Sequence, residues 1–217
     1  DDAQAMREAW FFNEWAGLEF LTDLGLTVAP RVYASNPPNR LLVLEDLGDR
    51  PPLMNILQRG NPEEAAEGLE RFLTLLGQLH AATYGHEDRF QTKRQALQAP
   101  EPPTDDAKVD LRDLRDDFAR NLTRLNILVP DGFAAEIAAV SAAIHDDPTF
   151  RVYTHSDAGP HNVQRGKPYR LFDFEFAGFR SGMLDASGPR MSFPSAYHGR
   201  PSPPEVVRRA EAAYRAA

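Results

Sequence analysis

The chain has 217 residues, of which 42% are hydrophobic and 26% are charged, and its formal net charge at pH 7 is −8. This length and apolar content suit a globular protein with a substantial core, and the acidic balance argues against a nucleic-acid partner, which needs a basic surface. The chain has no cysteine, which excludes disulfides and thiolate metal sites, and no long apolar run, so we expect a cytoplasmic protein without a membrane partner.

Residues 6–24 predict a helix, because Phe11, Leu18 and Leu21 recur on one face. Glu14 lies on that same face, where burial of an unpaired carboxylate costs several kcal/mol. Glu14 therefore either has a cationic partner or lies at the edge of the stripe and reaches water.

Two strands are expected next, at residues 28–34 and 40–45, on either side of a proline turn at residues 36–39. The second strand contains the continuous apolar run 41–44, which predicts burial on both faces. The acidic pair that follows, Glu45 and Asp46, is in itself typical of a solvated strand end.

A helix at residues 62–83 is predicted by Asn61 as N-cap, followed by a proline and two glutamates. His80 continues the apolar stripe of this helix, so we expect it in the core. Residues 85–107 contain three prolines and no sustained period, which predicts a long loop or lid.

Residues 109–127 predict a helix with an inward apolar stripe at Leu111, Leu114, Phe118, Leu122 and Leu125. The opposite face is acidic, with Asp110, Asp113, Asp116 and Asp117. A solvated face is the favoured interpretation, and the alternative is an acidic wall that attracts a cationic substrate. Further helices are expected at residues 133–144 and 205–217.

The most informative feature is the pattern H-x-D-x-x-x-x-N at residues 155–162, followed by D-x-E at residues 173–175. The residues between the two patterns predict two short strands around a Gly-Lys-Pro turn, and this hairpin would bring Asn162 and Asp173 side by side. Amide and carboxylate oxygens suit Mg²⁺ carrying a nucleotide phosphate, and Asp157 is placed to aim a hydroxyl nucleophile. Turn chemistry alone would explain single residues but not the ordered set.

Residues 152–185 resemble the C-terminal lobe of the aminoglycoside phosphotransferase and choline kinase-like enzymes, which are small-molecule relatives of the protein kinases. The resemblance implies that Asp157 is the catalytic base and that Asn162 and Asp173 are magnesium ligands. For Glu175 two roles stay open, help with a second ion or a local ion pair.

The same resemblance implies that His155 braces the catalytic loop, and Asp185 is similar to the later aspartate that such sequences carry. The segment around Glu14 resembles the family helix whose glutamate grips the phosphate-binding lysine. The backbone groups of Leu44 and Asp46 would then meet the adenine edge at the hinge between two lobes.

The resemblance implies an α+β, two-lobed protein-kinase-like fold, with residues 1–47 as the remainder of the N-terminal lobe and hinge and residues 48–217 as the catalytic lobe. The lysines of the chain are Lys93, Lys108 and Lys167, and none precedes Glu14 in a strand. A glycine-rich turn ahead of that helix is likewise missing. We therefore expect the natural protein to extend N-terminally, with a truncated small lobe in this sequence.

The function implied by the resemblance is phosphorylation of a hydroxyl group on a small molecule, with ATP or GTP and Mg²⁺. Aminoglycosides, amino alcohols and sugar-like compounds are candidate acceptors, and the net charge is compatible with a cationic one. The alternative is a catalytically inactive kinase-like binding or regulatory protein. The missing lysine favours this alternative, whereas the intact Asp157, Asn162 and Asp173 set argues against it.

Overall fold

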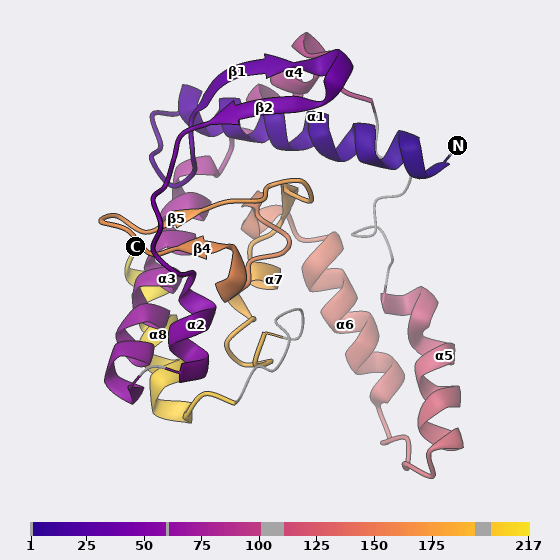
Figure 1. Ribbon diagram of the computed structural model, residues 1–217. Helices are drawn as coiled ribbons and strands as arrows, with labels where there is room; N and C mark the ends of the chain where they lie inside the picture. The colour runs from indigo at the N-terminus through magenta and orange to yellow at the C-terminus, as the bar shows by residue number, and fades with distance from the viewer. Residues whose placement is uncertain (1, 60, 101–110, 194–200) are drawn as a thin grey trace.

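A computed structural model describes residues 2–59, 61–100, 111–193 and 201–217 (Figure 1). The fold is α+β, with small antiparallel sheets among helices. The described helices are α1 (Asp2–Asp23), α2 (Leu53–Arg59), α3 (Pro62–Thr83), α4 (Glu87–Ala96), α5 (Leu111–Arg124), α6 (Phe133–His145), α7 (Met183–Ala186) and α8 (Pro204–Ala216). The strand pairs are β1 (Val32–Asn36) with β2 (Leu41–Leu44), β3 (Arg151–Thr154) with β6 (Gly178–Ser181), and β4 (Val163–Gln164) with β5 (Arg170–Leu171). None of the described helices is long and apolar enough to cross a membrane.

The β1–β2 ribbon lies along α1 and forms a small N-terminal layer above the helical body (Figure 1). The expected burial of β2 on both faces is wrong, since the side chains of Leu41 and Val43 are 58% and 55% exposed. In the described part of the chain this sheet has two strands. Alternate side chains of β2 therefore point to an open face, while Leu42 and Leu44 are half-buried.

The helix α1 packs closely on β3, because Gly17 leaves room for the side chain of Tyr153. A Cβ atom at Gly17 would overlap the Tyr153 hydroxyl group. The expected stripe of α1 is confirmed for Leu18 and Leu21, which are fully buried. This contact fixes the N-terminal layer to β3, the strand that leads into the H-x-D pattern.

The central element of the body is α3, which begins as predicted. The Asn61 side chain accepts a hydrogen bond of 2.8 Å from the backbone N–H of Glu64, and a proline occupies the first turn. Its apolar face is buried against α8 and β3 at Leu69, Phe72, Leu73, Leu76 and Leu79. His80 is also buried, as expected.

The expected loop at residues 85–107 is wrong for residues 87–96, which form α4, while residues 101–107 lie outside the described residues. Two side chains of this otherwise polar helix are buried. Phe90 joins an aromatic cluster with Phe20, Tyr153 and Phe179, at ring-centroid distances of 5.0–6.0 Å. Tertiary packing therefore stabilises a helix that lacks an amphipathic period.

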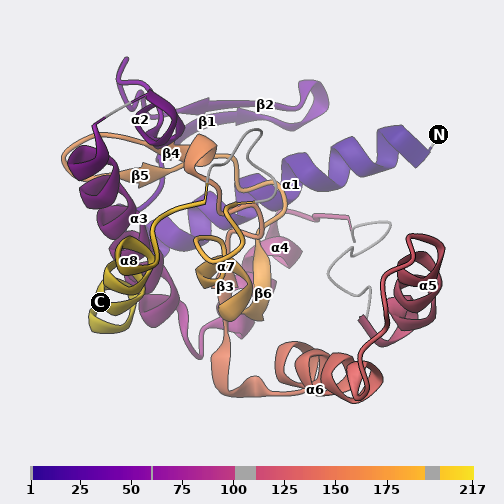
Figure 2. The same ribbon diagram turned by 90° about the horizontal axis from the view of Figure 1, so that it is seen from below.

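The helices α5 and α6 pack on each other and extend outward from the body (Figures 1 and 2), and α6 contacts β6. Of α5, only the side chains after residue 116 are described, and the inward stripe is wrong at Phe118 and Leu125, which are 48% and 69% exposed. Asp117 is exposed and pairs with Arg120 at 2.6 Å, which agrees with a solvated acidic face. Asp110 lies outside the described residues.

Candidate active site

The hairpin β4–β5 brings the two sequence patterns together, as predicted. Val163 pairs with Leu171, and the backbone N–H of Phe172 donates to the carbonyl oxygen of Asn162 at 3.1 Å. Asn162 therefore lies opposite Phe172, one residue before Asp173. The hairpin is tied to the N-terminal layer by the N–H of Leu171, which donates to Val28 at 2.7 Å.

Asn162 is linked directly to the loop residue Asp157. Its amide nitrogen donates to the backbone oxygen of Asp157 at 3.1 Å and to the carboxylate oxygen Oδ2 at 3.2 Å. Asn162 is 3% exposed, so the amide is fixed within the protein. Because both bonds use the amide nitrogen, Oδ1 of Asn162 remains available as a ligand.

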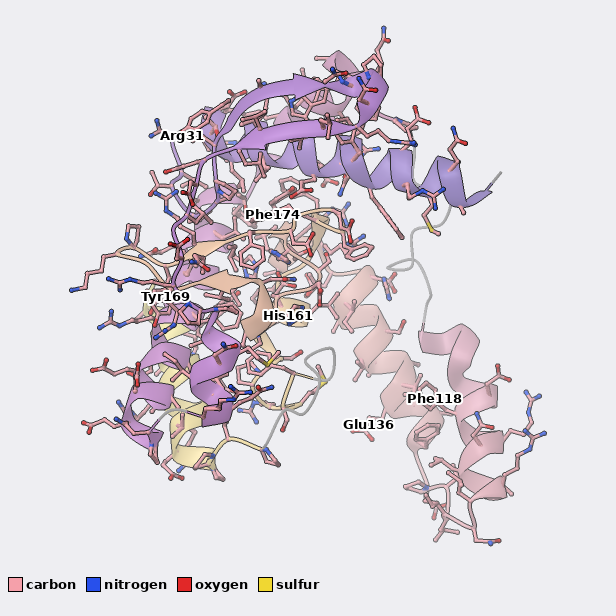
Figure 3. All side chains as sticks on the ribbon, in the orientation of Figure 1. Arg31, Phe118, Glu136, His161, Tyr169 and Phe174 are labelled. Carbon is pink, nitrogen blue, oxygen red and sulfur yellow. The ribbon has the colours of Figure 1, made fainter. Side chains whose placement is uncertain are left out.

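A second group also holds the Asp157 carboxylate. The ring of His161 lies against it, with 3.1 Å between Nε2 and Oδ2. In Figure 3, His161 lies at the centre of the molecule below Phe174, whereas Phe118 and Glu136 lie on the outlying α5–α6 pair. Sequence analysis did not single out His161, although its position four residues after the aspartate within the motif is a usable signal.

Asp173 and Glu175 follow β5 in a turn that begins with the exposed Asp173 in the left-handed region, at φ = 71°. Aspartate tolerates this region better than most residues. The pKa of Glu175 is raised by partial burial and by the negative charges of Asp173 and Asp157. The carboxylates of the two sequence patterns are thus close enough to repel one another.

Glu14 extends this negative region from α1. Burial, followed by the charge of Asp173, raises the pKa of Glu14 to about 7, and the backbone N–H of Phe174 acts in the opposite direction. Glu14 therefore faces the Asp173 turn rather than open solvent. Among the described residues, no lysine or arginine forms an ion pair with Glu14, Asp157, Asp173 or Glu175. The predicted cationic partner of Glu14 stays a prediction.

The neighbouring residue Asn13 is a site contact that sequence analysis missed. Its amide nitrogen donates to the carbonyl oxygens of Glu175 and Ala177 at 2.9 and 2.8 Å. Its Oδ1 accepts a 2.7 Å hydrogen bond from the buried Arg94 of α4. Asn13 therefore links two helices to the turn that carries Asp173.

The loop before Asp157 is braced by Asp185, which is buried in α7. The carboxylate of Asp185 accepts hydrogen bonds from the backbone N–H groups of His155 at 2.7 Å and Ser156 at 3.1 Å. Nε2 of His80 lies 3.3 Å from the same carboxylate, and its Nδ1 lies 2.8 Å from the hydroxyl of Tyr214. Helices α3 and α8 are thereby connected to the loop that carries Asp157.

Burial by itself raises the pKa of Asp185, but the bonds from His80 and from the backbone of His155 outweigh it and hold that pKa below its ordinary value. The ring of His155 is buried as well, and burial lowers its pKa. Its Nε2 lies 2.9 Å from the carbonyl oxygen of Phe172, so the neutral ring donates there. His155 thus ties the H-x-D strand end to the residue before Asp173.

The expected hinge residues lie beside the same hairpin. Leu44 ends β2, and Oδ1 of Asp46 accepts a 2.8 Å hydrogen bond from the N–H of Gly48. The amide of Gln164 in β4 donates to the carbonyl oxygen of Gly48 at 2.7 Å. The segment between β2 and α2 is therefore attached to the hairpin, and the adenine contacts of Leu44 and Asp46 stay predictions.

Comparison with known families tests the resemblance as a whole. A search among curated proteins found no match to the chain. The model of the phosphotransferase enzyme family matches residues 4–214. This match covers the whole arrangement described above, from α1 to α8, and the family has a protein-kinase-like fold. The chain therefore belongs to the phosphotransferase enzyme family, which includes aminoglycoside phosphotransferases and choline kinase-like proteins.

Proposed function

We propose that the protein transfers the terminal phosphoryl group of ATP or GTP to a hydroxyl group of a small molecule. Family membership makes it a kinase-like phosphotransferase. The observation that carries the proposal is the meeting of Asp157, Asn162 and Asp173 at one end of the β4–β5 hairpin. Phosphoryl transfer depends on positioning and electrostatic stabilisation, and such a set of oxygens suits both tasks.

The donor set fits a magnesium ion brought in by the nucleotide. Among the described residues, no three His, Cys, Asp or Glu side chains form a metal site of their own. Mg²⁺ commonly binds through one or two protein groups, with phosphate and water oxygens completing its shell. Oδ1 of Asn162 and the carboxylate of Asp173 are the groups that would hold it.

The charge distribution supports the same assignment. Mutual repulsion contributes to the raised pKa values of Glu14 and Glu175, and a bound cation would relieve it. The Glu175 side chain has no ion-pair partner in the described part of the chain, which favours its role with a second ion over a local pair. When bound, magnesium neutralises charge on the phosphates.

Asp157 is the general base of the proposed reaction. Its carboxylate takes the proton of the acceptor hydroxyl while a bond forms between that oxygen and the terminal phosphorus. The bond from this phosphorus to the bridging oxygen breaks, and the nucleoside diphosphate leaves with the electron pair. The cluster of carboxylates also favours a positively charged acceptor over an anionic one.

The alternative of an inactive kinase-like protein is not favoured. A binding module has no chemical need for a base carboxylate held by two donors next to metal-ligating oxygens. The family match adds weight on the side of catalysis.

A transfer assay with γ-labelled ATP and GTP tests the proposal, using a panel of aminoglycosides, amino alcohols and sugars with magnesium. We expect label transfer to at least one acceptor, and Asp157→Ala should lower kcat by about 10²-fold or more while nucleotide binding stays within a few-fold. Asp131→Ala, at an exposed position, is the matched control and should react like the wild type. An Asp157→Ala variant with wild-type turnover would refute the base assignment.

A further inference from the structure

We propose that His161 is a positioning residue that holds Oδ2 of Asp157, so that the other oxygen, Oδ1, takes the proton from the acceptor. This inference rests on the proposed function and adds to it the atom that reacts. The two oxygens of the Asp157 carboxylate differ in their hydrogen bonds. Both Nε2 of His161, at 3.1 Å, and the amide nitrogen of Asn162, at 3.2 Å, lie on Oδ2.

Oδ1 of Asp157 has no hydrogen-bond partner among the described residues. An oxygen that already accepts two hydrogen bonds is a poorer proton acceptor than one with free lone pairs. Hydrogen bonds to one oxygen also restrict rotation of the carboxylate. The free oxygen therefore stays directed towards the acceptor hydroxyl. The two donors together therefore select Oδ1 as the basic atom.

Gly159 leaves room for the ring of His161. Gly159 has φ = −105° and ψ = 157°, a conformation that any residue adopts, so backbone freedom does not explain the glycine. A Cβ atom at Gly159 would instead overlap the ring of His161 and come within 2.5 Å of its Nδ1. The absence of a side chain at position 159 thus leaves the space in which the ring lies.

The buried nitrogen of the His161 ring indicates which of its two nitrogens carries the proton. Nδ1 of His161 is buried and has no hydrogen-bond partner in the described part of the chain. A proton there would be a buried donor without an acceptor, which is more costly than an unprotonated nitrogen in the same place. The geometry therefore places a proton on Nε2, where it is donated to Asp157.

Three substitutions separate positioning from mere packing. His161→Leu removes the donor, whereas His161→Gln keeps an amide N–H at about the reach of Nε2. Gly159→Ala leaves the histidine in place but displaces its ring. We expect His161→Leu and Gly159→Ala to lower kcat about tenfold or more with unchanged nucleotide affinity, and the double variant to be no worse than either. His161→Gln should recover most of the lost kcat.

Crystal structures of the ligand-free wild type and His161→Leu give a readout independent of turnover. We expect a single Asp157 side-chain conformer in the wild type and at least two in the variant. An ordered, unchanged Asp157 in the variant would overturn the positioning role, and so would a glutamine variant no better than leucine. If the wild type transfers no phosphoryl group to any acceptor, the proposed function fails instead, while the conformers still decide how Asp157 is held.

Discussion

The loop at residues 155–162 and the α5–α6 pair differ in how they are held. The Asp185 carboxylate accepts hydrogen bonds from the backbone of this loop, and the amide of Asn162 and the ring of His155 donate further ones; all three side chains are buried. The α5–α6 pair exposes large apolar side chains, with Leu128 at 88%. The groups that we assign to phosphoryl transfer thus lie on a loop held by buried side chains, whereas most described side chains of α5 and α6 are exposed.

We propose that acceptor specificity resides on α5 and α6. Phosphoryl transfer requires the same positioned oxygens whatever the acceptor is. A surface that selects the acceptor needs to vary, and most described side chains of α5 and α6 are exposed. We therefore expect substitutions at the loop to lower activity and stability. Substitutions on α5 and α6 should change stability little.

The largest difference is expected for the buried brace. Asp185→Ala leaves two backbone N–H groups and His80 without their acceptor, which should cost about 3 kcal/mol or more of unfolding free energy. Asp117→Ala on α5 is the matched control and should stay within about 0.5 kcal/mol. Urea unfolding measures both, and a loss below about 1 kcal/mol for Asp185→Ala would contradict the brace.

The same carboxylate predicts a pH dependence. Because the pKa of Asp185 is lower in the folded protein, the charged group contributes stability above its ordinary pKa of about 3.9, and this is lost as the pH falls through the lower folded value. We expect the stability difference between wild type and Asp185→Asn to be constant near neutral pH and to shrink as the pH falls below about 4. A difference that grows on acidification would reverse the assigned sign.

A smaller loss is expected at the contact between α1, α4 and the Asp173 turn. Asn13→Ala removes three hydrogen bonds and leaves Arg94 without its side-chain acceptor, which should cost about 2 kcal/mol. The variant should also weaken the binding of magnesium–nucleotide by displacing the turn. Asn121→Ala, at an exposed position of α5, serves as the control in both titrations. Equal behaviour of the two variants would exclude a role for Asn13 in shaping the site.

The smallest effect is expected on the outlying pair itself. Leu128→Ser should change the unfolding free energy by no more than about 0.5 kcal/mol, because that side chain is already in solvent. Leu69→Ala in α3, where the side chain is 1% exposed, should cost about 2–5 kcal/mol in the same assay. Comparable losses for the two leucines would mean that Leu128 is covered in solution.

Sequence analysis succeeded where spacing along the chain determines structure. The β4–β5 hairpin follows from two short strands around one turn, so the meeting of Asn162 with the residues before Asp173 was predictable. The long helices α1 and α3 were likewise predicted, because their apolar residues recur at helical spacing and α3 has a clear N-cap.

The failures concern contacts between distant segments. Asn13 bonds to residues more than 160 positions away, and the helix that carries its partner Arg94 has no apolar period. The predicted burial of β2 was wrong for a related reason. Burial of a strand depends on which elements cover the sheet, and the sequence of the strand does not specify them. Both features depend on tertiary contacts, which the local sequence does little to predict.

The most direct test of the catalytic centre is a crystal structure with Mg²⁺ and a non-hydrolysable ATP analogue. We expect one magnesium ion at about 2.0–2.1 Å from both Oδ1 of Asn162 and a carboxylate oxygen of Asp173, shared with the phosphates. The terminal phosphate should lie beside Asp157, with Oδ1 of that residue facing the acceptor space. A magnesium–nucleotide complex bound away from Asn162 and Asp173 would contradict the proposed phosphotransferase site.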